Sequence, residues 1–114
     1  MAARNRLLEA LPHPVAQACQ GLGANLRRAR VRRGLTIADA AERIGVGPRA
    51  VMDAEKGKAS TGIAVYVALL WLYDLLGPFG DLADPAVDEE GGARARAEER
   101  RRPTRRREEL DDDF

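Results

Sequence analysis

The chain has 114 residues, 45% of them hydrophobic and 4% aromatic, and a formal net charge of +1. This length allows one compact domain with some chain left over, and a single cysteine, Cys19, excludes an internal disulfide. The most apolar window, residues 63–76, is shorter than the roughly 20 residues of a membrane span. We therefore expect a cytoplasmic protein without a membrane segment.

The first part of the chain predicts an N-terminal arm over residues 1–13 and a helix over residues 14–33. Pro14 suits a first helical position and disfavours helix at the residue before it. Gly21 and Gly23 predict that this helix is bent or starts late, because glycine weakens a helix interior. The apolar residues expected on its inner face are Val15, Leu22, Leu26, Ala29 and Val31.

Residues 36–57 have the spacing of a helix-turn-helix. Ala41 supplies the small residue at a close helix crossing, Gly45 a left-handed helix end, and Val51 an apolar plug for the second helix. This arrangement would bring the second helix to the surface, where it can enter the major groove of DNA.

Start and stop signals place both helices of this unit. Thr36 followed by Asp39 predicts a capping box at the start of the first helix. Gly47-Pro48 opens the second helix, with proline at the first helical position, and Gly57 closes it.

A further helix, apolar nearly all round, is predicted from a cap at Ser60 or Thr61 to Gly77-Pro78. A lone surface helix would show one apolar stripe only. The additional apolar surface either fills the core of a monomer or forms a two-fold dimer interface, and we favour the dimer.

A short last helix or a turn is expected over residues 79–82, ending at Asp84-Pro85. Residues 87–114 carry 8 Arg and 10 Asp/Glu and few apolar residues, which predicts a disordered charged tail. The chain is therefore expected to be all-α: a five-helix, repressor-type helix-turn-helix domain over residues 14–86, between an N-terminal arm and the tail.

The second helix of the unit carries few groups that can read bases. Arg49 can bind guanine, Ala50 can contact a thymine methyl group, and Asp53 can accept a hydrogen bond from cytosine although its charge repels phosphates. The expected base contacts are Gly47, Arg49, Ala50 and Asp53, and the expected phosphate contacts are Arg27, Arg28, Arg33, Thr36 and Lys56. Arg30 and Glu55 are placed to form an ion pair between the two helices that carry them.

The residue clusters of an enzyme are not found in the sequence. His13 is the only histidine, and there is no phosphate-binding loop, metal-ligand cluster or convergent carboxylate pair. We therefore expect no catalytic residue, no metal and no cofactor, and a protein whose partner is double-stranded DNA.

Residues 22–76 resemble the XRE/Cro-repressor type of helix-turn-helix domain. The resemblance is carried by LGANLRRARVRRGLT, AERIGV, the E-K-G that closes the second helix and the apolar helix that follows. It implies five helices, dimeric operator binding, transcriptional repression and an Arg30–Glu55 ion pair. Ile37, Gly47 and Pro48 depart from the family pattern, because they replace polar residues of the DNA-facing surface.

A narrower resemblance is to HipB-like antitoxins, carried by VALLWLYDLLGPFGDLADP and by a charged tail that ends in LDDDF. It implies an antitoxin that represses its own operon and binds a HipA-type Ser/Thr kinase toxin, with Leu110 and Phe114 as apolar anchors of the tail. A stand-alone repressor and a protein-interaction module with weakened DNA binding are the alternatives. The other interpretations of the tail are a solvated, solubilising segment and a second DNA-binding arm, although its interleaved Glu residues and acidic end argue against a simple DNA arm.

Overall fold

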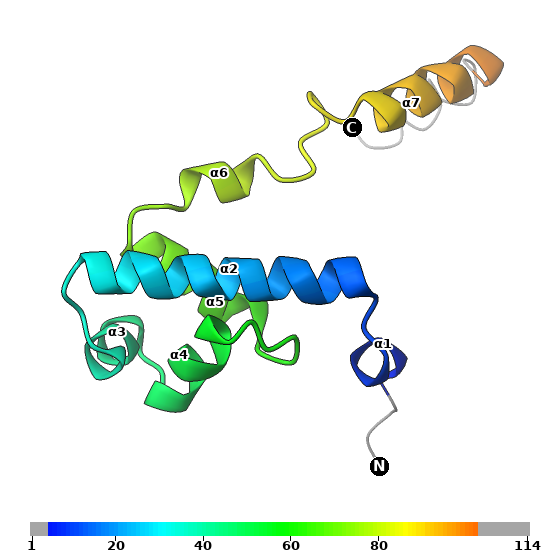
Figure 1. The fold of residues 1–114 in the computed structure, drawn as a ribbon. Coiled ribbons are helices and arrows are strands. Elements are labelled where there is room, and N and C mark those ends of the chain that lie inside the picture. Colours follow the sequence, from blue (N-terminus) through cyan, green and yellow to red (C-terminus); the bar gives the residue numbers. More distant parts are fainter. Residues whose placement is uncertain (1–4, 103–114) are drawn as a thin grey trace. The chain divides into compact units, whose positions relative to one another are not determined.

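The computed structural model describes residues 5–102, which contain helices and no strand (Figure 1). The helices are α1 (Arg6–Glu9), α2 (His13–Arg32), α3 (Ile37–Ile44), α4 (Pro48–Glu55), α5 (Ile63–Leu72), α6 (Gly77–Gly80) and α7 (Glu89–Arg101). The all-α prediction is confirmed. The chain forms two compact units, one ending at Phe79 and the other beginning at Gly80.

The core of the first unit lies where α2, α3, α4 and α5 meet (Figure 1). Small residues fill the helix crossings: Ala40, Ala41 and Ala54 are at most 1% exposed. The largest fully buried side chains are Tyr73, Leu26, Leu69 and Val51. Alanine at a crossing lets two helix backbones approach closely, so α3 and α4 can pack as a tight pair against α2 and α5.

The predicted ends of α3 and α4 are confirmed. At the start of α3 the Asp39 N–H donates to Thr36 Oγ1 over 3.0 Å, and the Thr36 N–H donates to Asp39 Oδ2 over 2.9 Å. Gly45 ends α3 at φ +80°, and Gly57 follows α4 at φ +71°. These left-handed positions favour glycine: Gly45 sets the short turn between α3 and α4, and Gly57 turns the chain away after α4.

Helix α2 runs without interruption through both glycines, contrary to the predicted bend or late start. Gly23 is required by packing. A Cβ there would lie 2.6 Å from the Ala54 carbonyl oxygen and 2.7 Å from both the Glu55 carbonyl oxygen and the Gly57 backbone nitrogen. A Cβ on Gly57 would in turn meet backbone atoms of α2 at 2.5 Å. The backbone of α2 therefore touches the backbone at the end of α4.

Two details of α2 differ from the prediction. The helix begins at His13, with Pro12 as N-cap and Pro14 in the first turn. Val15 and Val31 are 40% and 57% exposed and do not belong to the inner face. At about 100° per residue, Val31 lies about 140° around the helix from buried Leu26, so only Leu26 and Ala29 of the expected set are fully buried.

Helix α5 is shorter than predicted. It begins after Gly62, which makes no side-chain cap, rather than after Ser60 or Thr61. It ends at Leu72, because Asp74 adopts a left-handed conformation at φ 58° and turns the chain. The following N–H, that of Leu75, donates back to the Leu70 carbonyl over 2.8 Å, which closes the helix end.

In the second unit a helix, α7, replaces part of the predicted disordered tail. The Asp88 side chain accepts from the Gly91 N–H at its start. Pairs of opposite charge one turn apart, Glu90 with Arg94 and Glu98 with Arg102, support it at 2.7 Å and 3.2 Å. No residue of α7 is buried. The predicted anchors Leu110 and Phe114 lie outside the described residues.

Helical structure therefore extends into residues 89–101, beyond the range in which the sequence predicts it. Within residues 5–102, no helix is both long enough and apolar enough to cross a membrane.

Candidate nucleic-acid interface

Helix α4 has a sharp division between an inner and an outer face. Val51 and Ala54 are fully buried, whereas Arg49 is exposed on the opposite side. Asp53 lies one helical turn after Arg49, on the same outer side, and Ala50 is half-buried at its edge. Gly47, immediately before the helix, is exposed. Of the four expected base contacts, Gly47 thus lies at the start of α4, and Arg49, Ala50 and Asp53 lie on or at the edge of its outer face.

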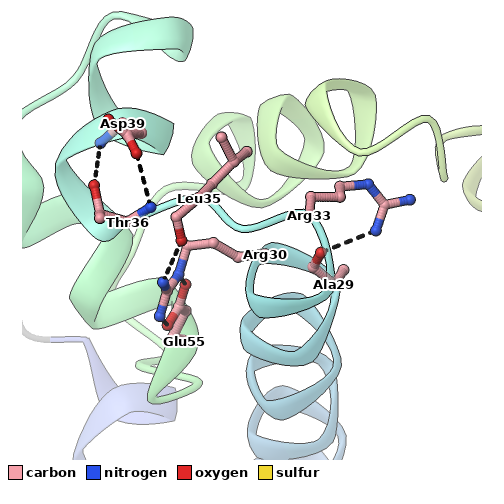
Figure 2. A network of polar contacts seen from close by, with 7 residues as sticks. All are labelled: Ala29, Arg30, Arg33, Leu35, Thr36, Asp39 and Glu55. Atoms are coloured by element: carbon pink, nitrogen blue, oxygen red, sulfur yellow. Dashed lines mark hydrogen bonds and ion pairs between the residues drawn. The ribbon is translucent and has the colours of Figure 1, made fainter.

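An ion pair between α2 and α4 holds this helix in place (Figure 2). Arg30 Nε donates to Glu55 Oε2 over 2.6 Å and a terminal nitrogen donates to Oε1 over 3.0 Å, which is the two-pronged geometry expected for arginine and carboxylate. The side chains are only 11% and 6% exposed. The hydrogen bonds to Glu55 raise the pKa of Arg30 above its usual value, so the guanidinium stays charged.

Arg30 also reaches the turn before α3, because its other terminal nitrogen donates to the Leu35 carbonyl over 2.8 Å (Figure 2). One guanidinium thereby joins α2, the start of the helix-turn-helix and the end of α4. The Arg30–Glu55 pair expected from the sequence is present, and it ties the end of α4 to α2.

A family model described as a helix-turn-helix domain matches residues 21–78, half of the chain. The chain belongs to this family. Comparisons with curated proteins and with solved structures find no match. Membership in the helix-turn-helix family supports a DNA-binding regulator, and it does not distinguish the kinds of regulator considered above.

Three of the basic residues expected to contact phosphates are exposed on the helix-turn-helix domain. Arg27 and Arg28 are exposed on α2 and line a hollow of about 430 Å³ with Ala24, Val31 and Glu55. Lys56 is exposed at the end of α4. None of these three basic side chains forms an ion pair within the described part of the chain. Their charges are therefore available to an anionic partner.

Arg33, expected at a phosphate, is engaged elsewhere in this helix-turn-helix domain. Its terminal nitrogens donate to the Ala29 carbonyl over 2.9 Å and to the Tyr73 carbonyl over 2.7 Å. Its guanidinium carbon also lies 5.5 Å from the centre of the Tyr73 ring. The residue ties the end of α2 to the end of α5, which leaves it fewer donors for a phosphate than Arg27 or Arg28 have. Figure 2 shows its bond to Ala29.

Thr36 and Ile37 lie at the start of α3. Thr36 is exposed, and its Oγ1 accepts from Asp39, so the hydroxyl proton remains available for a phosphate oxygen. Ile37 is half-buried and packs against the core. Ile37 therefore contributes apolar packing to the core and offers no polar side-chain group to DNA.

The sequence reasoning missed two residues that shape this interface. Lys58 pairs with Asp53, with Nζ 3.6 Å from Oδ2. Tyr73 is 1% exposed, and burial raises the pKa of its phenol. The sequence signal for Lys58 was the presence of Asp53 and Lys58, which have opposite charges, on either side of the Gly57 turn. For Tyr73, the signal was helical spacing, because Tyr66, Leu69 and Tyr73 recur at i, i+3 and i+7 and all three are buried.

Proposed function

We propose that the protein is a transcriptional regulator that inserts α4 into the major groove of double-stranded DNA. The observation that carries this proposal is the outer face of α4, where Arg49 is exposed and makes no ion pair within the described residues. The inner face is locked by Val51, Ala54 and the buried Arg30–Glu55 pair. A rigid helix with an unpaired arginine is suited to reading guanine through its O6 and N7 atoms.

The proposed roles follow position on the domain, taken as residues 14–86. Arg49 and Ala50 read bases, with Gly47 allowing close approach of the backbone and Asp53 available to cytosine. The proposed phosphate contacts are Arg27, Arg28, Thr36 and Lys56, which are all exposed. Arg33 is a secondary candidate for phosphate, because two of its donors are already in use, and Asp53 is a secondary candidate for cytosine, because it pairs with Lys58.

Selection from a pool of random duplexes by the full chain tests this function, followed by affinity measurements at several salt concentrations. We expect Arg49→Ala to bring the affinities for the selected duplex and a scrambled duplex closer together. Arg27→Ala should weaken both about equally and lower the salt slope by about one. Failure of the wild-type chain to enrich any duplex would refute DNA reading and favour the alternative of a protein-interaction module.

The proposed DNA-bound form is a homodimer that pairs through the outer face of α5. Ile63 and Trp71 on this helix are 68% and 62% exposed, and Leu75 just beyond it is 42% exposed. Their burial in a two-fold interface would place two copies of α4 on two half-sites. Sedimentation should show a dimer that Trp71→Arg converts to a monomer. A wild-type monomer at micromolar concentration would contradict this pairing.

The narrower proposal is an autoregulatory antitoxin that represses its operon and binds a HipA-type kinase toxin. Its support is the resemblance of residues 67–85 and of the tail to HipB-like antitoxins. Deletion of residues 108–114, which include Leu110 and Phe114, should weaken binding to a kinase encoded by the neighbouring gene and leave DNA binding intact. Unchanged affinity for that kinase, or a neighbouring gene of another kind, would favour a stand-alone XRE-type repressor.

A further inference from the structure

An acidic side chain lies on the face of α4 where DNA is proposed to bind. Asp53 is four residues after Arg49, so the two are neighbours on the helix surface and their opposite charges attract. An unpaired carboxylate at this place would repel phosphates and compete with guanine for the arginine. Base reading by Arg49 therefore requires that the charge of Asp53 be held by another group.

Lys58 is fixed beside Asp53 by both of its backbone groups. Its N–H donates to the Asp53 carbonyl over 3.0 Å, and its carbonyl accepts from the Tyr66 hydroxyl over 2.8 Å. Tyr66 is 8% exposed, so this second bond anchors Lys58 to the core. The position of Lys58 is thus set by the fold, and its side chain starts close to the carboxylate.

The side chains complete the arrangement. Lys58 Nζ lies 3.6 Å from Asp53 Oδ2, and the Asp53 side chain is 19% exposed, against 56% for Lys58. Arg49 forms no ion pair with Asp53 or with any other described residue. Lys56, on the same end of α4, has no ion pair within the described range either, so it provides a matched control.

We propose that Lys58 is a positioning residue for base reading. It neutralises Asp53, which leaves the guanidinium of Arg49 unpaired for guanine and removes a negative charge from the path of the phosphates. This inference rests on the proposed function, because it concerns how α4 presents itself to DNA. Lys58 thus acts on DNA binding through Asp53 and Arg49 of α4, and not by a phosphate contact of its own.

A double-mutant cycle tests the inference, with the full chain and the duplex it selects from a random pool as the probe. Lys58→Gln should weaken binding about tenfold when Asp53 is present and less than about threefold in the Asp53→Asn background. Lys58→Arg should restore binding in the presence of Asp53. The control Lys56→Gln should cause the same loss in both backgrounds, as expected for a group that contacts phosphate alone.

A second readout separates positioning from general attraction. Lys58→Gln should also reduce the preference for the selected duplex over a scrambled one, because Asp53 then competes for Arg49. Equal losses from Lys58→Gln in both backgrounds, with preference unchanged and circular dichroism showing a folded chain, would overturn the inference and leave DNA binding in place. A wild-type chain that selects no duplex would overturn the proposed function, and the inference with it.

Discussion

Two glycines of α2, two residues apart, should respond to alanine in opposite directions. Gly21 is exposed and has no atom within 4 Å of the place where a Cβ would stand. Gly23 is buried, and its Cβ would meet three backbone atoms of residues 54–57 at 2.6–2.7 Å. Backbone atoms cannot rotate away as a side chain does, so relief requires α2 and the end of α4 to separate.

The magnitudes follow from these contacts. Alanine in place of glycine within a helix stabilises by roughly 0.5–1 kcal/mol, and Gly21→Ala should gain this amount in full. In Gly23→Ala the same gain is opposed by a separation of about 0.8 Å at the contact, and overpacking of this kind costs about 1–3 kcal/mol or more. Because the helical gain is the same in both variants, they should differ in the free energy of unfolding by the overpacking cost, about 1–3 kcal/mol or more.

Urea unfolding of both variants, followed by far-ultraviolet circular dichroism, measures this difference. In thermal unfolding each kcal/mol should move the midpoint by about 4–8 °C for a domain of this size. Gly23→Ala should also weaken DNA binding at temperatures where it remains folded, because the end of α4 is displaced. A Gly23→Ala variant as stable as Gly21→Ala would refute the close backbone contact.

Three further predictions concern stability. Glu55→Gln should lower the free energy of unfolding in urea by about 3–5 kcal/mol, because it leaves the buried Arg30 guanidinium without its carboxylate. Replacement of both Arg30 and Glu55 by methionine should recover most of this loss. No recovery in the double variant would contradict this account. The Thr36 N–H lowers the pKa of Asp39, so this carboxylate should stabilise the fold above its unfolded pKa of about 3.9 and lose that effect as the pH falls through its lower folded pKa. Below about pH 5 the urea midpoint of Asp39→Asn should therefore fall less steeply than that of the wild type. Parallel curves for the two proteins would argue against this role of Asp39. Asp74→Gly should raise the thermal midpoint by relieving up to about 1 kcal/mol at the left-handed position, and Asp74→Val should lower it; similar midpoints for the two would count against strain there.

Local signals in the sequence were sufficient for the helix-turn-helix itself. The Thr36–Asp39 capping box, Gly45, Pro48 and Gly57 each act within a few residues, so chain order alone reveals them. The outward position of Arg49 followed from helical periodicity, given that Val51 is inside.

Features that depend on contacts between distant segments were not accessible in this way. Gly23 resembles any glycine that weakens a helix until α4 is placed against it. Arg33 resembles its neighbouring arginines until the end of α5 provides the Tyr73 carbonyl. The end of α5 was misplaced because an aspartate, Asp74, takes a left-handed position that the prediction reserved for glycine.

The length of α4 limits how much information one copy of the domain can extract from DNA. Eight helical residues extend about 12 Å, which corresponds to about three or four base pairs at 3.4 Å each. A four-base word recurs by chance about every 256 base pairs, whereas a genome offers at least about a million competing positions. A single domain would therefore be occupied at thousands of unintended sites. Two copies acting on an eight-base word would reduce that number about 256-fold, so selectivity in the cell would depend on the number of domains bound together more than on the strength of any one contact.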